Sequence, residues 1–279
     1  MRTLVHLSDL HFGRIDTALI APLTELIGNI KPDLVVVSGD LTQRARTEQF
    51  RAARSFLDAL PTPQIVVPGN HDIPLHNVFS RFMQPLEKYR RHITDDLDPF
   101  YMDDEIAVLG INTARSLTMK NGRINQAQMD WVRARLGTLE DHITKIIVTH
   151  HPFDLPLDFG DRELVGRAPS AMNIFAGCKV DMLLAGHLHA SHAGITAARY
   201  KLPDYSALAV QAGTATSTRG RGESNSFNII RIAAGVIAIE HVSWKPESGV
   251  FSSASTETFD HTPNGWLSNG LVRNTGASQ

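Results

Sequence analysis

Cysteine is almost absent from this chain, with Cys178 as its one example among 279 residues, and long apolar runs are absent as well. One cysteine cannot form an internal disulfide, and a membrane-spanning helix needs about 18 consecutive apolar residues. The N-terminus passes from a single arginine into the apolar run of residues 3–7, which predicts a strand rather than a signal peptide. We therefore expect a cytoplasmic protein that does not enter a membrane.

An excess of basic charge and a large aromatic content are also missing. The chain has 27 Lys and Arg against 29 Asp and Glu, and its aromatic residues, 7% of the total, do not cluster with basic residues. Proteins that hold long nucleic acids need a basic surface and often stacking side chains. We therefore expect a small phosphorylated molecule as the partner, not long DNA or RNA.

What the chain does contain is a series of five short polar motifs, each directly after an apolar, strand-like run. They are Asp9-x-His11, Gly39-Asp40, Gly69-Asn70-His71-Asp72, His150-His151 and Gly186-His187-x-His189. Each motif alone is common in surface turns, but all five in this order are hard to obtain by chance. Aspartate, asparagine and histidine without thiolate suit two divalent metals such as Mn, Fe, Zn or Co. Such a cluster predicts the hydrolysis of phosphate esters.

Strands and helices are predicted to alternate as far as residue 185. Apolar patterns indicate strands at 4–7, 34–37, 64–67, 106–111, 145–149 and 181–185, and helices at about 17–30, 47–60, 75–92 with a break at Pro85, and 125–136. In open α/β sheets, ligands bind beyond the carboxyl ends of the strands, which is where each motif lies. Residues distant in the sequence are therefore expected to meet in one cavity, within a single domain.

The pattern changes after His189. Strands are predicted at about 194–200, 206–212, 226–233 and 236–243, and because no helices separate them we expect them to pair antiparallel and to complete a second sheet. From residue 246 the chain is rich in Ser, Thr, Asn and Gly. We expect residues 1–245 to form the catalytic domain and residues 246–279 an irregular extension, packed on that domain or on a partner subunit of a homo-oligomer.

The order of the five motifs resembles that of the calcineurin-like metallophosphoesterase superfamily, over roughly residues 1–192. The segment from Gly69 to Pro74 is most similar to the bacterial cyclic nucleotide phosphodiesterase branch. The resemblance implies a four-layer αββα sandwich of two mixed β-sheets flanked by helices, with a dinuclear metal site at the carboxyl ends of the strands. It implies that Fe and Mn are favoured, that one metal is held by Asp9, His11 and His189 and the other by Asn70, His150 and His187, and that Asp40 bridges them.

The resemblance and the chemistry of phosphodiesters together suggest a mechanism. A hydroxide that bridges the two metals is expected to attack phosphorus, because a metal lowers the pKa of bound water to about 7. His71, directly after Asn70, is the candidate for assisting the leaving oxygen, since imidazole donates a proton near neutral pH. Asp72 is expected to orient the His71 ring.

Other residues and other functions stay open at the level of sequence. His151 is expected to pack behind the metals, because adjacent side chains on an extended segment point to opposite faces. Asn112, Arg115, Arg219 and Arg221 are candidates for contacts with substrate. A phosphomonoesterase acting on a small metabolite is one alternative, and a non-catalytic scaffold is another. A cyclic nucleotide is the favoured substrate, with 3′,5′-cyclic, 2′,3′-cyclic and linear diesters all possible.

Overall fold

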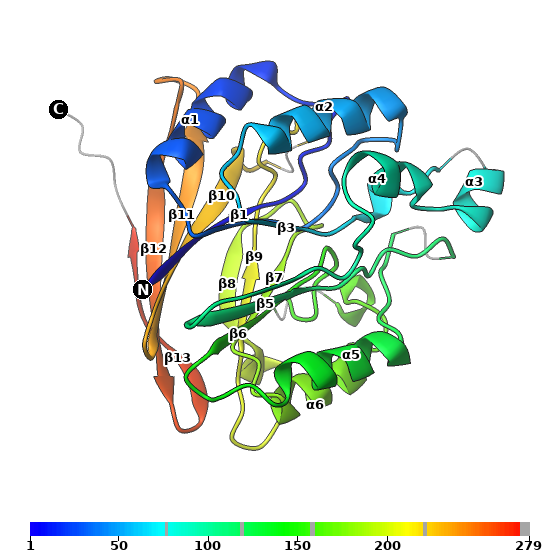
Figure 1. Cartoon of the computed structure of the whole chain (residues 1–279). Coiled ribbons are helices and arrows are strands. Elements are labelled where there is room, and N and C mark those ends of the chain that lie inside the picture. Colours follow the sequence, from blue (N-terminus) through cyan, green and yellow to red (C-terminus); the bar gives the residue numbers. More distant parts are fainter. Residues whose placement is uncertain (76–77, 118–119, 157–159, 220–221, 274–279) are drawn as a thin grey trace.

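Two mixed β-sheets lie face to face, and helices cover the outer face of each, in the computed structural model shown in Figure 1. The structure describes residues 1–75, 78–117, 120–156, 160–219 and 222–273. Helices α1 and α2 lie on one side of the pair of sheets, and α5 and α6 lie on the other. The predicted sandwich of two mixed sheets with flanking helices is confirmed.

The first sheet has the strand order β13-β12-β11-β10-β1-β2-β3. Strands β1, β2 and β3 are parallel, and the strands from β10 to β13 continue the sheet antiparallel from the other edge of β1. The bounds are β1 Arg2–Leu7, β2 Leu34–Val37, β3 Gln64–Val66, β10 Ser226–Ala233, β11 Val236–Lys245, β12 Val250–Thr262 and β13 Gly265–Arg273.

The second sheet has the strand order β4-β5-β6-β7-β9-β8. Its four central strands are parallel, and β4 and β8 are antiparallel edges. The bounds are β4 Phe100–Met102, β5 Ile106–Gly110, β6 Thr144–Val148, β7 Met182–Ala185, β9 Leu208–Gln211 and β8 His192–Ile195.

The helices follow the apolar periodicity of the sequence. Their bounds are α1 Ile20–Ile30, α2 Thr47–Asp58, α3 Val78–Met83, α4 Glu87–His92, α5 Gln126–Leu136 and α6 Ala168–Gly177, and short 3-10 helices span Thr17–Leu19, Asn70–Asp72, Asp161–Glu163 and Thr196–Ala198. The predicted break near Pro85 separates α3 from α4. Asn125 caps α5 by accepting a hydrogen bond from the backbone N–H of Gln128, which satisfies an otherwise unpaired donor.

Three apolar layers hold the four layers of backbone together. Alternation along β1 sends Leu4 into the layer between the sheets, while Val5 and Leu7 pack toward α1 and α2. The third layer lies between the second sheet and helices α5 and α6. Each sheet is thus covered on both faces in its parallel part, which is why β2 reads as an unbroken apolar run.

Two expectations about the second half of the chain are wrong. The strands after His189 do not complete one sheet: β8 and β9 extend the second sheet, whereas β10 and β11 extend the first. Residues 250–273 are not irregular, because β12 and β13 form a hairpin that continues the first sheet. Most β12 side chains are only half buried, so a Ser- and Thr-rich composition is compatible with a strand there. Of the described helices, none has the length and apolar character needed to cross a membrane.

Candidate metal centre

The five motifs meet where the parallel strands of both sheets end. The loops after β1, β2 and β3 carry Asp9, His11, Asp40 and Asn70, and the loops after β6 and β7 carry His150, His187 and His189. All except Asn70 are buried, with exposed fractions of 7% or less. Four of the side chains therefore come from one sheet and three from the other.

Five of these residues have a left-handed backbone. The φ angles are 53° for Asp9, 50° for His11, 51° for Asp40, 75° for His187 and 60° for His189. A residue with a Cβ pays roughly 1–3 kcal/mol for an unfavourable conformation of this kind, so the surrounding contacts must hold it. Hydrogen bonds between loops do this, from the Asp9 N–H to the Gly39 carbonyl at 3.1 Å and from the His11 N–H to the Asp40 carbonyl at 2.9 Å.

Asp9, His11 and His189 form one group of converging atoms. Asp9 Oδ1 lies 3.2 Å from His189 Nε2 and 3.5 Å from His11 Nε2. The two imidazole nitrogens are 3.2 Å apart, and Asp40 Oδ2 lies 3.7 Å from His11 Nε2. One cation at the centre of this group would contact all of these atoms.

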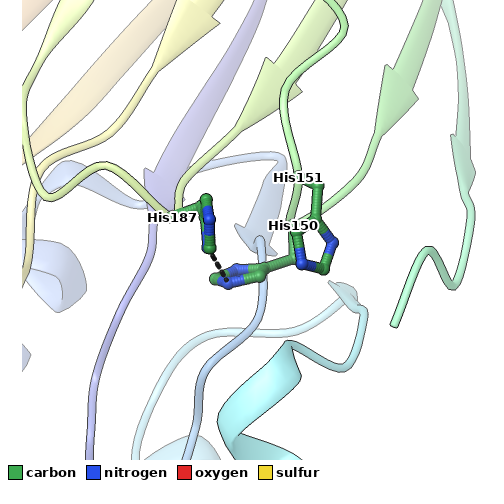
Figure 2. A group of neighbouring side chains, drawn as sticks. All are labelled: His150, His151 and His187. Carbon is green, nitrogen blue, oxygen red and sulfur yellow. Dashed lines mark hydrogen bonds between the residues drawn. The ribbon is translucent and has the colours of Figure 1, made fainter. Parts of the chain in front are cut away.

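Asn70, His150 and His187 form a second group next to the first. His150 Nε2 lies 3.1 Å from Asn70 Oδ1, 3.3 Å from His187 Nδ1 and 3.4 Å from Asp40 Oδ2. Figure 2 shows the contact between the His150 and His187 rings, with the His151 ring beside that of His150. Asp40 faces both groups.

Each carboxylate uses one oxygen for the protein and turns the other toward the centre. Asp9 Oδ2 accepts from the Ser8 hydroxyl at 2.7 Å and from the His187 N–H at 2.9 Å, while Oδ1 faces the imidazoles. Asp40 Oδ1 accepts from the His71 N–H at 2.8 Å, while Oδ2 faces both groups. Two imidazoles are oriented likewise. Nδ1 of His150 donates to the Ser38 carbonyl and Nδ1 of His189 donates to the Arg219 carbonyl, which leaves Nε2 of each ring as the ligating nitrogen.

In the metal-free chain the buried carboxylates and imidazoles of the centre lie close together and shift one another's pKa values. Burial alone would raise the pKa of Asp9, but hydrogen bonds with His11 and His189 outweigh it and hold that pKa well below its usual range. Burial likewise would lower the pKa of His150, but the charge of Asp40 raises it to about 9. A proton on His150 thus supplies positive charge next to Asp40 in the metal-free chain.

The arrangement fits divalent metal ions. Asp9 Oδ1, which faces the imidazoles, is buried without a hydrogen bond to a described residue, and a buried polar atom without a partner is costly. Two pairs of imidazole nitrogens also face each other at 3.2 and 3.3 Å, where their lone pairs repel unless a cation or a proton lies between them. Carboxylate and amide oxygens combined with imidazole form the mixed ligand set that Mn, Fe, Co and Zn accept.

His71 stands at the edge of the centre, with its ring 4.9 Å from that of His11. Its Nδ1 donates to the Gln43 carbonyl at 2.9 Å, so that Nε2 is the nitrogen that faces outward. Arg219 Nη1 lies 3.1 Å from this Nε2.

Asp72 does not orient the His71 ring, contrary to our expectation, because Gln43 does so. The Asp72 carboxylate instead accepts hydrogen bonds from the backbone N–H groups of Leu41, Thr42 and Gly69 and from the Thr42 hydroxyl. Burial, followed by the charge of Asp40, raises the pKa of Asp72 to about 6. Asp72 therefore clamps the loop after β2 to the loop after β3.

His151 lies behind the centre. Its Nδ1 accepts from the Thr113 hydroxyl at 2.8 Å and its Nε2 donates to the Lys120 carbonyl at 3.0 Å. The ring lies close enough to His150 and His187 to complete a metal triad by distance alone. Its two hydrogen bonds occupy both ring nitrogens, so neither is free to bind a metal.

The candidate substrate contacts differ in their surroundings. Arg115 is half buried, and its guanidinium donates to the carbonyls of Asn112 and Ala114 and to Gln128. Asn112 is itself buried, and its amide oxygen accepts from the Ala114 N–H. Arg219 is the candidate that reaches the centre, through His71. Arg221 lies outside the described residues.

Several residues that shape the site carry no motif. Ser8 holds Asp9 through its hydroxyl, and Ser38, Gln43 and Arg219 act through backbone carbonyls. A carbonyl is present at every position, so residue type gives no signal for such a contact. Ser8 had one available signal, its position directly before the first ligand.

Comparisons with known proteins identify the family of the chain. The family model described as calcineurin-like phosphoesterase matches residues 2–191. A glycerophosphodiester phosphodiesterase of Enterobacter lignolyticus is 28% identical over 72% of this chain and 78% of its own length. A cAMP/cGMP dual specificity phosphodiesterase of Mycobacterium tuberculosis is 25% identical over 82% of this chain and 75% of its own length.

Solved structures show the same fold at lower identity. A structure of PhoD superposes with a TM-score of 0.72 at 12% identity, covering 99% of this chain and 72% of that one. A dimetal phosphatase from Danio rerio superposes with a TM-score of 0.62 at 16% identity, covering 86% of this chain and 95% of that one. With the family model matching more than half of its length, this chain belongs to the calcineurin-like phosphoesterase family and is a metal-dependent phosphoester hydrolase.

Proposed function

We propose that the enzyme hydrolyses small phosphodiesters at a two-metal centre, with cyclic nucleotides as its substrate class. The observation that carries this proposal is the pair of ligand groups that share Asp40, whose Oδ2 lies 3.7 Å from His11 Nε2 and 3.4 Å from His150 Nε2. A single ion would leave one group of buried imidazoles uncompensated. The completeness of both groups argues against a non-catalytic scaffold, since buried carboxylates and imidazoles are costly without a metal.

Seven residues of the chain would hold the two ions. Asp9, His11 and His189 would hold one ion, Asn70, His150 and His187 would hold the other, and Asp40 would contact both. The ions would supply positive charge for the phosphoryl oxygens and an activated water as nucleophile.

His71 would assist the leaving oxygen through Nε2. The Gln43 carbonyl fixes Nδ1 as the protonated nitrogen of the neutral ring, so donation from Nε2 requires the imidazolium form. Arg219 would leave His71 and donate to a phosphate oxygen when substrate binds, which frees Nε2 for the leaving oxygen.

The charge around the centre favours a diester over a monoester. A monoester carries about one more negative charge than a diester at neutral pH and calls for additional cations. Arg115 is committed to backbone carbonyls and Gln128, so that Arg219 is the one guanidinium of the candidate set that lies beside His71 among the described residues.

A glycerophosphodiester is the second candidate substrate. It is favoured by the 28% identity to the relative named as a glycerophosphodiester phosphodiesterase. Relatives named for cyclic nucleotides are similar at 25–27% identity, so identity does not separate the two substrates.

The test is a substrate panel with the metal-free chain reconstituted in turn with Mn, Fe, Co and Zn. The panel contains 3′,5′-cyclic and 2′,3′-cyclic nucleotides, a glycerophosphodiester, bis(p-nitrophenyl) phosphate and p-nitrophenyl phosphate. We expect the cyclic nucleotides to give the highest kcat/KM. Faster hydrolysis of the monoester than of every diester would contradict the assignment to phosphodiesters. No turnover with any metal would favour the alternative of a non-catalytic scaffold.

His71→Ala tests the assistance to the leaving group. We expect metal content near that of the wild type and a loss of about 10²–10⁴-fold in kcat for a cyclic nucleotide, with a much smaller loss for bis(p-nitrophenyl) phosphate, whose leaving group needs no proton. His142→Ala is the matched control, because His142 is exposed and its imidazole lies next to the Glu140 carboxylate. Equal losses with both substrates would show that His71 does not act as the acid.

A further inference from the structure

A polar cavity of about 610 Å³ lies between the two sheets, apart from the metal ligands. Strand β8 forms one wall, and strands β10 to β13 form the other. The C-terminal hairpin, β12 and β13 in Figure 1, extends the first sheet until β13 contacts β8. The wall formed by strands β10 to β13 lies beyond residues 2–191, the part of the chain that the family model matches.

The inner face of the first sheet changes character along its strands. At one end Ile232, Phe259 and Trp266 belong to the apolar layer between the sheets. Toward the other end, strand register aligns Asn228 with His241, His241 with Ser255 and Ser255 with Arg273 in a polar row. This row lines the cavity, where the opposing sheet no longer packs against it.

Polar atoms of the lining that have no hydrogen bond to a described residue point to a ligand. Asn228 is 2% exposed, and its amide nitrogen donates to the Gln211 carbonyl at 3.0 Å. Within the described residues no hydrogen bond reaches its amide oxygen, which is therefore available as an acceptor in the cavity. Ser243 is 7% exposed, lines the same cavity, and its hydroxyl likewise has no hydrogen bond to a described residue. His241 also lines the cavity, and its Nδ1 is buried without a hydrogen bond to a described residue. A polar atom this buried normally has a partner.

The charge of the lining favours a cation. The carboxylates of Glu223 and Glu257 line the cavity with one guanidinium, that of Arg273, so negative charge is in excess among the described residues. Burial lowers the pKa of His241, which keeps its imidazole neutral at pH 7. The volume lies within the range of about 300–1,000 Å³ that is typical of small-molecule sites.

We propose that this inter-sheet cavity is a second binding site, and that its ligand is a small hydroxylated organic amine in its protonated form. Its ammonium group lies between Glu223 and Glu257, and its hydroxyls donate to the Asn228 amide oxygen and the Ser243 hydroxyl. An anion is disfavoured by the carboxylates, and an apolar ligand leaves the polar row unpaired. The site does not depend on the identity of the hydrolysed substrate.

Three sugars of one size test the charge requirement. The metal-loaded full-length chain is titrated calorimetrically at pH 7 with glucosamine, glucose and glucuronate, which carry an ammonium, no charge and a carboxylate on the same ring. We expect glucosamine to bind at least about tenfold more tightly than glucose, and glucuronate to bind more weakly than both. Equal affinity for the three sugars, or no saturable binding of glucosamine, would overturn the proposal.

Variants and a structure of the complex locate the site. Glu257→Gln is expected to weaken glucosamine binding about tenfold while glucose binding stays within about twofold, because a charge-assisted hydrogen bond is roughly twice as strong as a neutral one. Glu247→Gln, on the exposed turn after β11, changes the net charge equally and should have no effect. Ser255→Tyr should fill the cavity and abolish binding of both sugars. Unchanged glucosamine affinity in Glu257→Gln, or crystallographic density for the sugar at the metal centre instead, would refute the assignment.

Discussion

Asp72→Asn separates two roles for Asp72, orientation of the His71 ring and clamping of the metal-binding loops. The clamp follows from four hydrogen bonds, in which Oδ2 accepts from the N–H groups of Leu41 and Gly69 and Oδ1 accepts from the N–H and the hydroxyl of Thr42. An asparagine replaces one of these oxygens by an NH₂ group, which is itself a donor. In either orientation of the amide, at least one buried backbone N–H loses its acceptor.

The magnitude follows from these lost acceptors. A buried donor left unpaired costs about 1–3 kcal/mol, so the lost acceptors would lower the free energy of unfolding by about 2–4 kcal/mol. The neutral amide also removes the buried charge, whose cost raises the pKa of Asp72, and this offsets part of the loss. For a chain of this length we therefore expect Tm to fall, by no more than roughly 4–8 °C. Since Leu41 and Gly69 are the chain neighbours of Asp40 and Asn70, metal affinity should fall together with stability.

The assay is thermal unfolding of the metal-free protein at pH 8, followed by metal analysis after reconstitution. That pH lies above the pKa of about 6 of Asp72, so the wild-type carboxylate is ionised. Asp58→Asn is the control, because Asp58 is an exposed carboxylate at the end of α2, paired with Arg54. Wild-type stability and metal content combined with a loss of turnover like that of His71→Ala would refute the clamp and restore the orienting role.

Three further predictions concern other parts of the chain. Gly186→Ala should abolish metal binding, because its Cβ would lie 1.7 Å from the Ser8 hydroxyl oxygen that holds Asp9. Burial lowers the pKa of His6 to about 3, below its unfolded value of 6.5, so neutral His6 stabilises the fold above pH 6.5 and this contribution is lost as the pH falls toward 3. The loss should reach about 1.4 kcal/mol per pH unit, and urea unfolding of His6→Gln across this range should show a flatter pH dependence. Trp266→Ala should lower the free energy of unfolding by about 3–5 kcal/mol in the same assay, since Trp266 is 3% exposed in the layer between the sheets.

Each of these has a matched control. Gly177→Ala meets no atom within 4 Å of the added Cβ and should retain metal. His142→Gln, at an exposed position, should leave the pH dependence of stability unchanged. Leu267→Ala, next to Trp266 but 51% exposed, should change stability by at most about 0.5 kcal/mol. A metal-replete Gly186→Ala, an unaltered pH profile in His6→Gln, or equal effects of the two hairpin substitutions would each contradict the corresponding reasoning.

Sequence patterns predicted the parallel parts of both sheets well, because buried strands and amphipathic helices have distinct apolar periodicities. The run at 34–37 and the helix at 47–60 are examples, and the motif after each strand indicated which side chains meet. The hairpin of β12 and β13 was not predicted, because its half-exposed strands need few apolar residues. The roles of Asp72 and Gln43 were not predicted for another reason. Their contacts involve backbone groups, and residue type does not indicate such contacts.

Because the ligands are divided between two sheets, the geometry of the active site depends on the relative position of the sheets. A metal–ligand bond tolerates displacements of about 0.2 Å, so the sheets cannot slide over each other by more than a fraction of an ångström without loosening an ion. Remote positions such as Ile106 and Ile230, buried at the interface of the sheets, therefore affect catalysis through alignment alone. Removing one methylene there, as in Ile→Val, should change metal affinity without altering any group that contacts the substrate.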